Sequence, residues 1–277
     1  MIPISVVILT HNEEKNLPHC LKSLSGMVQS VDVVDSGSTD STRSIAEASG
    51  ARVVVHPFES HARQWNWALE NLPFSTDWIL GIDADHRVTP ELLAAMETFL
   101  KTEAGVNGAY VVRREVFLGR WIRHGGYYPK HLLKLFRKGF ARADENDLVD
   151  HHFRVNGPVV ILKGDLIEDN LKEHDLFFWM SKHVHYAMLQ AEQEHRGRPE
   201  WNGRLMGNPD ERVQKMKSHW VRMPLFLRSF LYFCYRYFVL LGLLDGIEGL
   251  IFHGFQAFWY RFLVDIRLTE LRSPERR

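Results

Sequence analysis

Short apolar runs recur through the first hundred residues, and they restrict the fold more than any other feature of the chain. The runs are rich in Val, Ile and Leu and cover residues 4–9, 31–34, 52–55 and 78–82. Such runs are typical of strands that are buried on both faces of a parallel sheet. Helix-like stretches separate them at residues 14–24, 41–49 and 62–72. This alternation predicts βαβ units in a doubly wound α/β sheet.

Polar turns follow three of the predicted strands. The sequence Thr-His-Asn-Glu occupies residues 10–13, Asp-Ser-Gly-Ser-Thr-Asp occupies residues 35–40, and Asp-Ala-Asp occupies residues 83–85. Ligands of open α/β sheets bind outside the carboxyl ends of the strands, so we expect these turns to form a binding site. Some of the same residues are good helix caps, and one turn can hold both roles, with Asp40 capping a helix while Asp35 faces a ligand.

The pair Asp83 and Asp85 is the sharpest chemical signal in these turns. Two carboxylates one residue apart at a strand end can both face a cleft, and hard divalent cations such as Mg or Mn prefer oxygen ligands of this kind. A cation held there would neutralise the charge on a leaving diphosphate. On its own the pair also fits a solvated turn, so the prediction depends on the other turns that converge with it.

Charge balance and cysteine content argue against several classes of protein. The 34 basic and 34 acidic residues cancel, which argues against a nucleic-acid partner. Cys20 and Cys234 are far apart and give neither a disulfide framework nor zinc-ligand spacing. The first residues do not resemble a signal peptide. We therefore expect the chain in the cytoplasm.

From about residue 108 to residue 164 the strand-like pieces become shorter and rich in Arg, His, Tyr and Gly. A basic and aromatic cluster lies in this stretch, and such a cluster can grip a diphosphate or another anion and stack on a sugar face. A solvated basic patch is the alternative. The members of the cluster are Arg113, Arg114, Arg120, Trp121, Arg123, His124, Tyr127 and Tyr128.

Residues 175–194 have the residue spacing of a helix, and residues 197–209 are predicted to form a loop or linker.

Residues 220–268 are dense in Phe, Leu, Tyr and Trp, but charged residues interrupt them. No uncharged run reaches the roughly 20 residues that a membrane-spanning helix needs. The pattern predicts amphipathic helices that lie in a membrane interface. A helical hairpin packed on the rest of the chain or on another subunit is the alternative. The membrane prediction is favoured because the apolar content exceeds what one core-facing stripe requires.

Four motifs, in this order and spacing, resemble the family 2 glycosyltransferases with the GT-A fold. They lie at residues 4–14, 34–40, 64–69 and 82–85. Residues 117–126, 135–137 and 156–157, together with aromatic segments of the C-terminal region, are similar to a bacterial subgroup that adds sugars in lipopolysaccharide core and exopolysaccharide synthesis. The resemblance implies a nucleotide-sugar-binding half at residues 1–105, an acceptor-binding half at residues 106–196, and a linker with amphipathic helices at residues 197–277.

The resemblance also implies roles for single residues. Thr10, Glu13 and Asp35 would hold the nucleoside of the donor, with Asp35 facing the base. Gln64 and Asn66 would lie near the donor diphosphate or sugar. Asp83 would face the ribose or the metal, and Asp85 would bind the metal. The implied cofactors are Mg or Mn and a nucleotide-sugar, with a UDP-sugar expected first. Ser36 departs from the family pattern, because many relatives carry a second Asp there.

A general base is expected on the acceptor side, where it would take the proton from the attacking hydroxyl. Asp150 is the predicted base. His151 occupies its place in one plausible register, and Glu145 and Asp147 are nearby competitors. A surface loop without a catalytic role is the alternative for all of them.

The sequence thus predicts an inverting glycosyltransferase that uses metal-assisted single displacement. The expected acceptor is lipid-linked, or belongs to lipopolysaccharide or exopolysaccharide, and the expected location is the inner face of the cell membrane. A catalytically silent nucleotide-sugar or membrane-binding scaffold is one alternative. A sugar nucleotidyltransferase is another, although residues 10–13 lack the Gly-rich basic loop that such an enzyme usually has. The sugar, the base, the linkage and the oligomeric state are left open.

Overall fold

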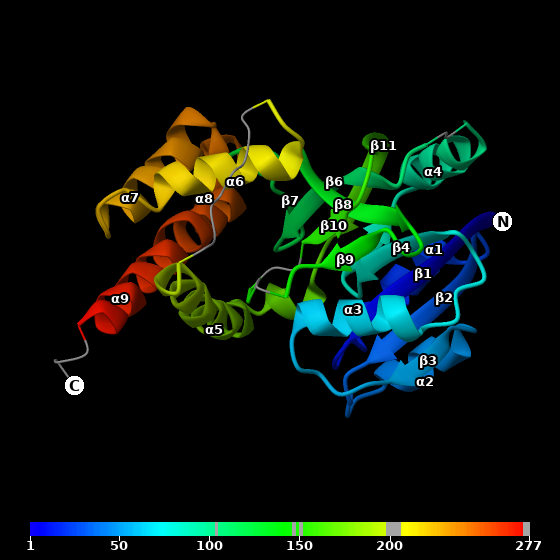
Figure 1. Cartoon of the computed structure of the whole chain (residues 1–277). Helices are drawn as coiled ribbons and strands as arrows, with labels where there is room; N and C mark the ends of the chain where they lie inside the picture. The colour runs from blue at the N-terminus through cyan, green and yellow to red at the C-terminus, as the bar shows by residue number, and fades with distance from the viewer. Residues whose placement is uncertain (103–104, 146–147, 150–151, 198–205, 274–277) are drawn as a thin grey trace. The chain divides into compact units, whose positions relative to one another are not determined.

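The computed structural model describes residues 1–102, 105–145, 148–149, 152–197 and 206–273 (Figure 1). The chain forms two compact units. Unit 1 consists of Met1–Trp121 and Tyr128–Asp175, and unit 2 consists of Ile122–Tyr127 and Leu176–Arg277. The division into donor and acceptor halves with a C-terminal region stays a prediction.

One mixed sheet forms the centre of unit 1. Its strands lie in the order β3 (Arg52–Val55), β2 (Val28–Asp35), β1 (Ile2–Thr10), β4 (Trp78–Asp83), β8 (Lys130–Arg137), β6 (Gly108–Phe117), β11 (Val159–Glu168) and β5 (His86–Val88), and β7 (Arg120–Trp121) pairs with β6. Strands β8 and β5 run antiparallel to their neighbours, and the other pairs along this order are parallel. The mixed α/β sheet confirms the predicted fold class, and β1 to β4 lie where the apolar runs predicted strands.

The sheet separates two cores, which explains why its central strands are apolar on both faces. Ile4, Val6 and Ile8 of β1 face a core shared with α1 (Leu17–Leu24), α2 (Thr42–Ala48) and α4 (Pro90–Thr102). Val7 and Leu9 face the other core, which α3 (His61–Asn71) shares with the small sheet of β9 (Ala141–Ala143) and β10 (Phe153–Val155). Successive side chains of a strand point to opposite faces, so both sets must be apolar.

Gly81 interrupts the apolar run of β4 because two aromatic rings pack against the strand at that point. A Cβ atom on Gly81 would lie 3.1 Å from the ring of Phe153 and 3.2 Å from the ring of Trp65. These two rings meet edge to face, with centroids 5.0 Å apart. The missing side chain therefore lets α3 and β10 approach the sheet closely.

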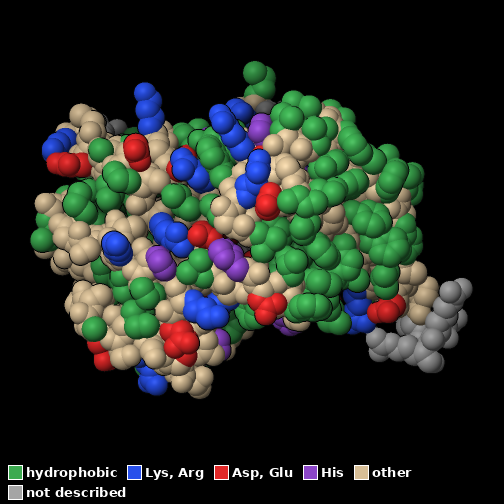
Figure 2. Space-filling view, turned by 180° about the vertical axis from the view of Figure 1, so that it is seen from behind, with side chains coloured by type: hydrophobic (Ala, Val, Ile, Leu, Met, Phe, Trp, Pro, Cys, Tyr) green, Lys and Arg blue, Asp and Glu red, His purple; other side chains and the backbone are tan. Residues whose placement is uncertain are grey.

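Unit 2 is helical. Its α-helices are α5 (Leu176–His195), α6 (Pro209–Trp220), α7 (Leu227–Cys234), α8 (Gly246–His253) and α9 (Tyr260–Arg272). Some of them are joined by the π-helical segments η2 (Tyr235–Val239) and η4 (Gly254–Trp259) and by the 3-10 helix η3 (Gly242–Asp245). Helices α5 and α9 pack together through Ala187, Ala191 and Val264. Figure 2 shows hydrophobic side chains gathered over the surface of the C-terminal helices.

The segment Ile122–Tyr127 belongs to unit 2 although both of its neighbours in sequence belong to unit 1. Asp245 accepts hydrogen bonds from the backbone N–H and the ring Nδ1 of His124, at 2.8 and 2.7 Å. Arg236 donates to the carbonyl oxygen of Gly125 at 2.6 Å. Gly125 has φ +68°, and a Cβ atom there would lie 2.0 Å from the ring of His253, so only glycine fits.

Among the described residues, no single helix is both long and apolar enough to cross a membrane. The pair Leu227–Val239 and Gly242–Arg272, which bends by 71°, passes the same test of length and composition when it is taken together.

Candidate functional site

The carboxyl ends of β1, β2 and β4 lie side by side at one edge of the sheet. Thr10 is paired with Asp35, and Leu9 is paired with Asp83 in the strand register. The three predicted polar turns therefore start from adjacent strands. We call the residues of these turns, 10–14, 35–42 and 83–86, the strand-end site.

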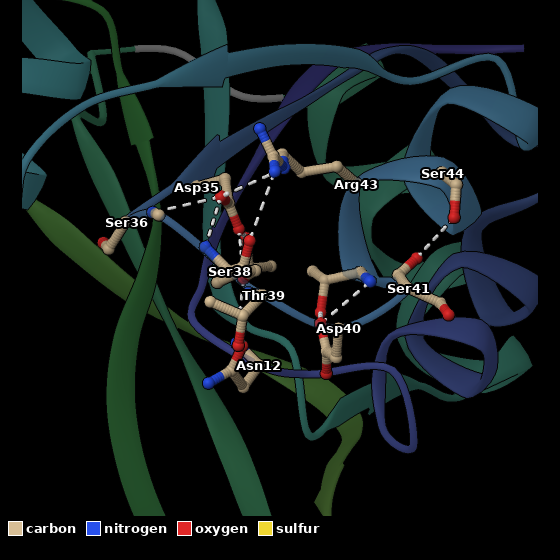
Figure 3. A network of polar contacts seen from close by, with 12 residues as sticks. Asn12, Asp35, Ser36, Ser38, Thr39, Asp40, Ser41, Arg43 and Ser44 are labelled. Carbon is tan, nitrogen blue, oxygen red and sulfur yellow. Dashed lines mark hydrogen bonds and ion pairs between the residues drawn. The ribbon is translucent and has the colours of Figure 1, made fainter.

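Asp35 is fully buried, and its carboxylate is bound by its own turn and by β1 (Figure 3). It accepts hydrogen bonds from the backbone N–H groups of Gly37 and Ser38 at 3.1 and 2.9 Å, from the Thr10 hydroxyl at 3.0 Å, and from the Ser38 hydroxyl. The guanidinium of Arg43 lies 3.9 Å away. The sequence prediction brings Thr10 and Asp35 together correctly, but a ligand would have to exchange with one of these bonds to reach the Asp35 carboxylate.

A second set of hydrogen bonds joins the first turn to the second. The Asn12 side-chain oxygen accepts from the backbone N–H of Thr39 at 2.8 Å, and the backbone N–H of Glu13 donates to the Thr42 hydroxyl at 2.7 Å. Asp40 accepts from the backbone N–H of Thr42 at 3.0 Å, but the N-cap residue of α2 is Ser41 and its side chain makes no capping hydrogen bond, so the cap predicted at Asp40 is wrong. The two turns thus form one rigid unit rather than independent loops.

A third group of contacts links Glu13 to Asp85 through the segment that follows β11. Asn16 donates to Glu13 at 2.8 Å and to the side-chain oxygen of Asn170 at 3.0 Å. Asn170 donates to Asp85 at 3.1 Å, and Lys172 pairs with Glu13. Asn16 is 1% exposed, so this network is a fixed part of the site. Two predicted site residues, Glu13 and Asp85, are therefore connected by amides that the sequence did not single out.

Gln64 and Asn66 are both buried on α3, and both hold neighbouring backbone in place. Gln64 bonds the ring of His56 at 2.7 Å and donates to the Ser36 hydroxyl at 3.2 Å. Asn66 accepts from the backbone N–H of Ala143 at 2.8 Å and donates to the carbonyl oxygen of the same residue at 3.1 Å. Gln64 thus borders the strand-end site, whereas the amide of Asn66 is committed to β9.

Asp83 accepts a hydrogen bond from the ammonium group of Lys134 at 3.0 Å. Lys134 lies on β8 and is 4% exposed, with the rings of Trp65 and Phe153 each 5.9 Å from its nitrogen. The backbone N–H of Asp83 donates to the buried ring of His86 at 3.0 Å. A buried cation therefore neutralises the first carboxylate of the Asp-Ala-Asp turn.

Beyond His86 the ion pairs continue into β11 and β6. The His86 ring lies 3.2 Å from Glu168, and Arg113 bridges Glu168 at 2.8 Å to Glu115 at 2.5 Å. Burial raises the pKa of Glu115 to about 7 against the opposing pull of Arg113. Burial also acts on Glu168, but Arg113 and His86 outweigh it and hold the pKa of that carboxyl below its usual range.

Oxygen ligands for a divalent cation are present in the strand-end site, although they are few. No group of three or more His, Cys, Asp or Glu side chains able to hold a metal ion occurs in the part of the chain that the structure describes. Mg and Mn need only one or two protein carboxylates when phosphate oxygens and water supply the other ligands. Asp85 accepts a hydrogen bond from the neutral amide of Asn170, and Asp83 is paired with Lys134, so both carboxylates of the turn are candidates for this role.

The predicted general base, Asp150, lies outside the described residues, as do its competitors Asp147 and His151. Glu145 is described and exposed. It accepts from Asn66 at 3.0 Å and from Arg142 at 3.2 Å, and these hydrogen bonds lower the pKa of its carboxyl. The identity of the general base stays a prediction.

The two arginines of the basic and aromatic cluster that lie on β6 are paired with carboxylates. Arg113 and Arg114 are neighbours on β6 and point to opposite faces of it, where Arg113 meets Glu115 and Glu168 and Arg114 meets Asp165. His124 and Tyr127 belong to unit 2. Trp121 stacks under the guanidinium of Arg114 at 4.3 Å. The anion-binding role of the cluster stays a prediction, with Arg113 and Arg114 already paired to carboxylates of β6 and β11.

Lys134, Asn170 and Lys172 contact predicted site residues but were missed. Asn170 and Lys172 follow the carboxyl end of β11, which lies at the same edge of the sheet as the other turns. The rule that directed attention to residues 10–13 would have found them, had β11 been recognised. Lys134 lies inside a strand among apolar residues, and a lone charge in such a run is the signal that identifies it.

Comparison with known proteins adds to this geometry. The family model described as "Glycosyl transferase family 2" matches residues 5–164. An "Uncharacterized glycosyltransferase" of Rickettsia felis is 42% identical over 97 residues, which cover 35% of this chain and 34% of that protein. The "Lipopolysaccharide core biosynthesis glycosyltransferase LpsC" of Rhizobium meliloti is 33% identical over 153 residues, which cover 52% of this chain and 54% of that protein. The chain thus matches between a third and about half of the length of these relatives.

Among solved structures, glucosyl-3-phosphoglycerate synthase from Mycobacterium tuberculosis, in complex with Mn²⁺ and UDP-glucose, is 31% identical to the aligned part of this chain. The alignment covers 40% of this chain and 43% of that chain, with a TM-score of 0.35.

The family match takes in every turn of the strand-end site and extends to β11. It covers more than half of the chain, and the mixed sheet agrees with the predicted GT-A class. The chain belongs to glycosyl transferase family 2.

Proposed function

We propose that this chain transfers a sugar from a nucleotide-sugar to an acceptor hydroxyl by a single, inverting displacement. The observation that carries the proposal is the convergence of the turns after β1, β2 and β4, within a chain of glycosyl transferase family 2. A sheet of this kind binds ligands at that edge. A UDP-sugar is the first donor to test.

The strand-end site provides a rigid cradle for the donor. Thr10, Glu13 and Asp35 hold the nucleoside, and Gln64 supports their turn through Ser36. The hydrogen bonds between the first two turns keep these groups in place before the donor arrives, which reduces the entropy cost of binding. Asn66 lies near the donor diphosphate or sugar and is held by its hydrogen bonds to the backbone of Ala143.

Asp83 and Asp85 would hold Mg or Mn, and the bound cation would supply charge neutralisation for the leaving nucleoside diphosphate. Asp150 takes the proton from the acceptor hydroxyl as that hydroxyl attacks the anomeric carbon. Lys134 orients the Asp83 carboxylate through the hydrogen bond between them.

The acceptor proposed is a lipid-linked sugar or a growing lipopolysaccharide or exopolysaccharide, reached from the cytoplasm at the inner face of the cell membrane. The match to the lipopolysaccharide core enzyme LpsC supports this class of acceptor. The aromatic character of unit 2 supports a membrane location.

Calorimetric titration of nucleoside diphosphates and their sugars, with and without Mn, tests the proposal. The wild type should bind one nucleotide in a metal-dependent manner, and Asp85→Ala should weaken that binding by roughly a hundredfold, or about 2.7 kcal/mol. Asp77→Ala is the matched control, because Asp77 is exposed and lies just before the opposite end of β4. It should bind like the wild type.

Binding of a nucleotide to the wild type that is equal with and without Mn would contradict the metal role. A chain that binds a nucleotide-sugar but releases no nucleoside diphosphate in the presence of membrane extract would be a scaffold rather than an enzyme.

A further inference from the structure

The stretch from residue 225 to residue 258 in unit 2 carries its apolar side chains on the outside. Every residue in it that is exposed to solvent is aliphatic or aromatic, and Val239, Ile247 and Phe238 are exposed by 67%, 62% and 55% (Figure 2). We call these exposed residues the apolar face. They are Phe226, Leu227, Phe230, Leu231, Tyr235, Phe238, Val239, Leu241, Leu243, Leu244, Ile247, Leu250 and Phe258.

Two charged residues of the same stretch, Arg228 and Asp245, are buried and paired. Arg228 is 3% exposed, and it donates to Asp265 at 2.6 Å and to Glu194 at 3.0 Å. Asp245 is also 3% exposed and holds His124. Arg236 is half-buried, with its guanidinium 4.4 Å from the ring of Tyr127. Unit 2 therefore reverses the usual arrangement of a protein in water over this stretch.

A hydrocarbon environment accounts both for the apolar side chains on the outside and for the paired charges on the inside. In a bilayer, charged side chains face the interior of a bundle and pair with one another, while apolar side chains face the lipid. A protein partner would fit less well, because even the core of a protein interface is only about 65% apolar and contains hydrogen bonds. Apart from the hydroxyl of Tyr235, the side chains of the apolar face offer no hydrogen-bonding group.

The lengths of the helices determine how unit 2 can enter a bilayer. Residues Leu227–Val239 and Gly242–Arg272 meet at a bend of 71°, and neither crosses a membrane alone. Arg222 lies before the apolar face and Arg272 lies after it, and both are exposed. Cations at the margins of an apolar surface meet lipid phosphates at the membrane interface.

We propose that the apolar face inserts into the acyl region of one leaflet of a lipid bilayer, so that unit 2 is a monotopic anchor. The anchor deepens the proposed function, because it would bring the chain to an acceptor in the membrane. It rests on the proposed function only in this link to the acceptor. It differs from surface adsorption by charge, because the contact is between uncharged side chains and hydrocarbon.

Flotation of the full chain with vesicles of phosphatidylethanolamine and phosphatidylglycerol tests the anchor. The wild type should float with the vesicles at low salt and also in about 1 M NaCl, where the Debye length falls to about 3 Å. Replacement of Phe238 and Ile247 together by Glu should lower the bound fraction at least tenfold. The matched control replaces Phe58 and Ile161 of unit 1, which are exposed by 51% and 53%, and it should float like the wild type.

The unmodified chain provides a second measurement that does not depend on the folding of a variant. Vesicles that carry a photoactivatable group on the acyl chain should label peptides within residues 225–258 and leave unit 1 unlabelled. Labelling confined to unit 1, release of the wild type by salt, or equal flotation of the double variant and the wild type would each overturn the proposal.

Sedimentation of the chain without lipid tests whether a second copy of the chain, rather than a bilayer, covers the apolar face. A wild-type dimer that the double variant converts to a monomer, together with no flotation of the wild type, would assign the apolar face to self-association and overturn the anchor. Nucleotide titration separates this proposal from the proposed function. If vesicle binding holds while no nucleotide binds, the anchor stands and the transfer reaction fails.

Discussion

Asp83 at the strand-end site of unit 1 and the pair of Asp265 and Arg228 in unit 2 differ in how far their charges are open to solvent. Asp83 at the strand-end site keeps 29% of its side chain exposed, even though Lys134 pairs with it. Asp265 in unit 2 has none of its side chain exposed, and its partner Arg228 has 3%. A charge that remains partly open to solvent can exchange its partner for a ligand, whereas a buried pair is fixed by the cost of separating it. The comparison teaches that Asp83 is open to exchange with a ligand, whereas the pair of Asp265 and Arg228 serves folding.

The largest expected effect comes from the buried pair of unit 2. Asp265→Asn removes one charge and leaves Arg228 with Glu194 as its carboxylate partner. The free energy of unfolding should fall by about 3–5 kcal/mol, which urea denaturation monitored by circular dichroism would measure. The control is Glu270→Gln on the same helix, which disrupts the exposed pair with Arg267 and should cost less than about 1 kcal/mol. Equal costs for the two variants would remove the contrast between buried and exposed charges.

Glu115 sharpens the comparison, because it is a buried acid within unit 1. Its pKa in the folded chain is about 7, above the ordinary value of 4.5, so the folded state binds more protons than the unfolded state between these values. Stability should therefore fall as the pH rises through this interval, by about 2 kcal/mol between about pH 5 and about pH 8. The lowered pKa of Glu168 acts only at lower pH, where protonation of that carboxyl costs stability.

Glu115→Gln should abolish most of this pH dependence, as measured by urea denaturation at the two pH values. Glu91→Gln, an exposed acid on α4, serves as the control and should keep the wild-type slope. A Glu115→Gln variant with an unchanged slope would mean that another group takes up the proton.

Lys134→Met tests whether Asp83 is a metal ligand. Removal of the ammonium group 3.0 Å from Asp83 should leave that carboxylate more available to a cation. Affinity for Mn without nucleotide should rise roughly tenfold, about 1.4 kcal/mol, as measured by electron paramagnetic resonance. Lys138→Met is the control, because Lys138 is exposed and follows the end of the same strand. An unchanged Mn affinity would leave Asp85 as the ligand and assign Asp83 to the ribose.

The smallest effect is expected at the position that departs from the family pattern. Ser36→Ala removes one hydrogen bond from Gln64, which keeps its bond to the backbone of His56 at 3.2 Å. Nucleotide affinity should fall by about two- to threefold, within the range of one neutral hydrogen bond. Ser44→Ala on the outer side of α2 should have no effect on the same titration. A loss of more than about tenfold would make Ser36 a direct ligand of the donor.

The first half of unit 1 could be predicted from the sequence because its strands are buried on both faces. Strands β1 to β4 lack charges in the positions that face the two cores, apart from the buried Asp32 of β2, so their apolar runs are visible. Strands β6 and β11 are each ten residues long, but Arg113, Glu115 and Asp165 interrupt their apolar pattern. These charges are paired between neighbouring strands, and pairing of this kind cannot be read from one segment alone.

The site was predictable only where its contacts are local or lie on adjacent strands. Thr10 and Asp35 were placed together because both follow apolar runs. Lys134 reaches Asp83 across 51 residues of sequence, and Asn170 reaches Asp85 across 85. Their roles depend on the antiparallel insertion of β8 and on the placement of β11, which the hydropathy pattern did not reveal.

The segment Ile122–Tyr127 has a consequence for protein engineering. The chain leaves unit 1 after Trp121, returns at Tyr128 and leaves again after Asp175, so the two units are not consecutive modules. A cut after residue 175 would remove Asp245, Arg236 and His253 while their partners at His124 and Gly125 stayed behind. A functional chimera that takes its helices from a relative therefore has to exchange residues 122–127 in the same step.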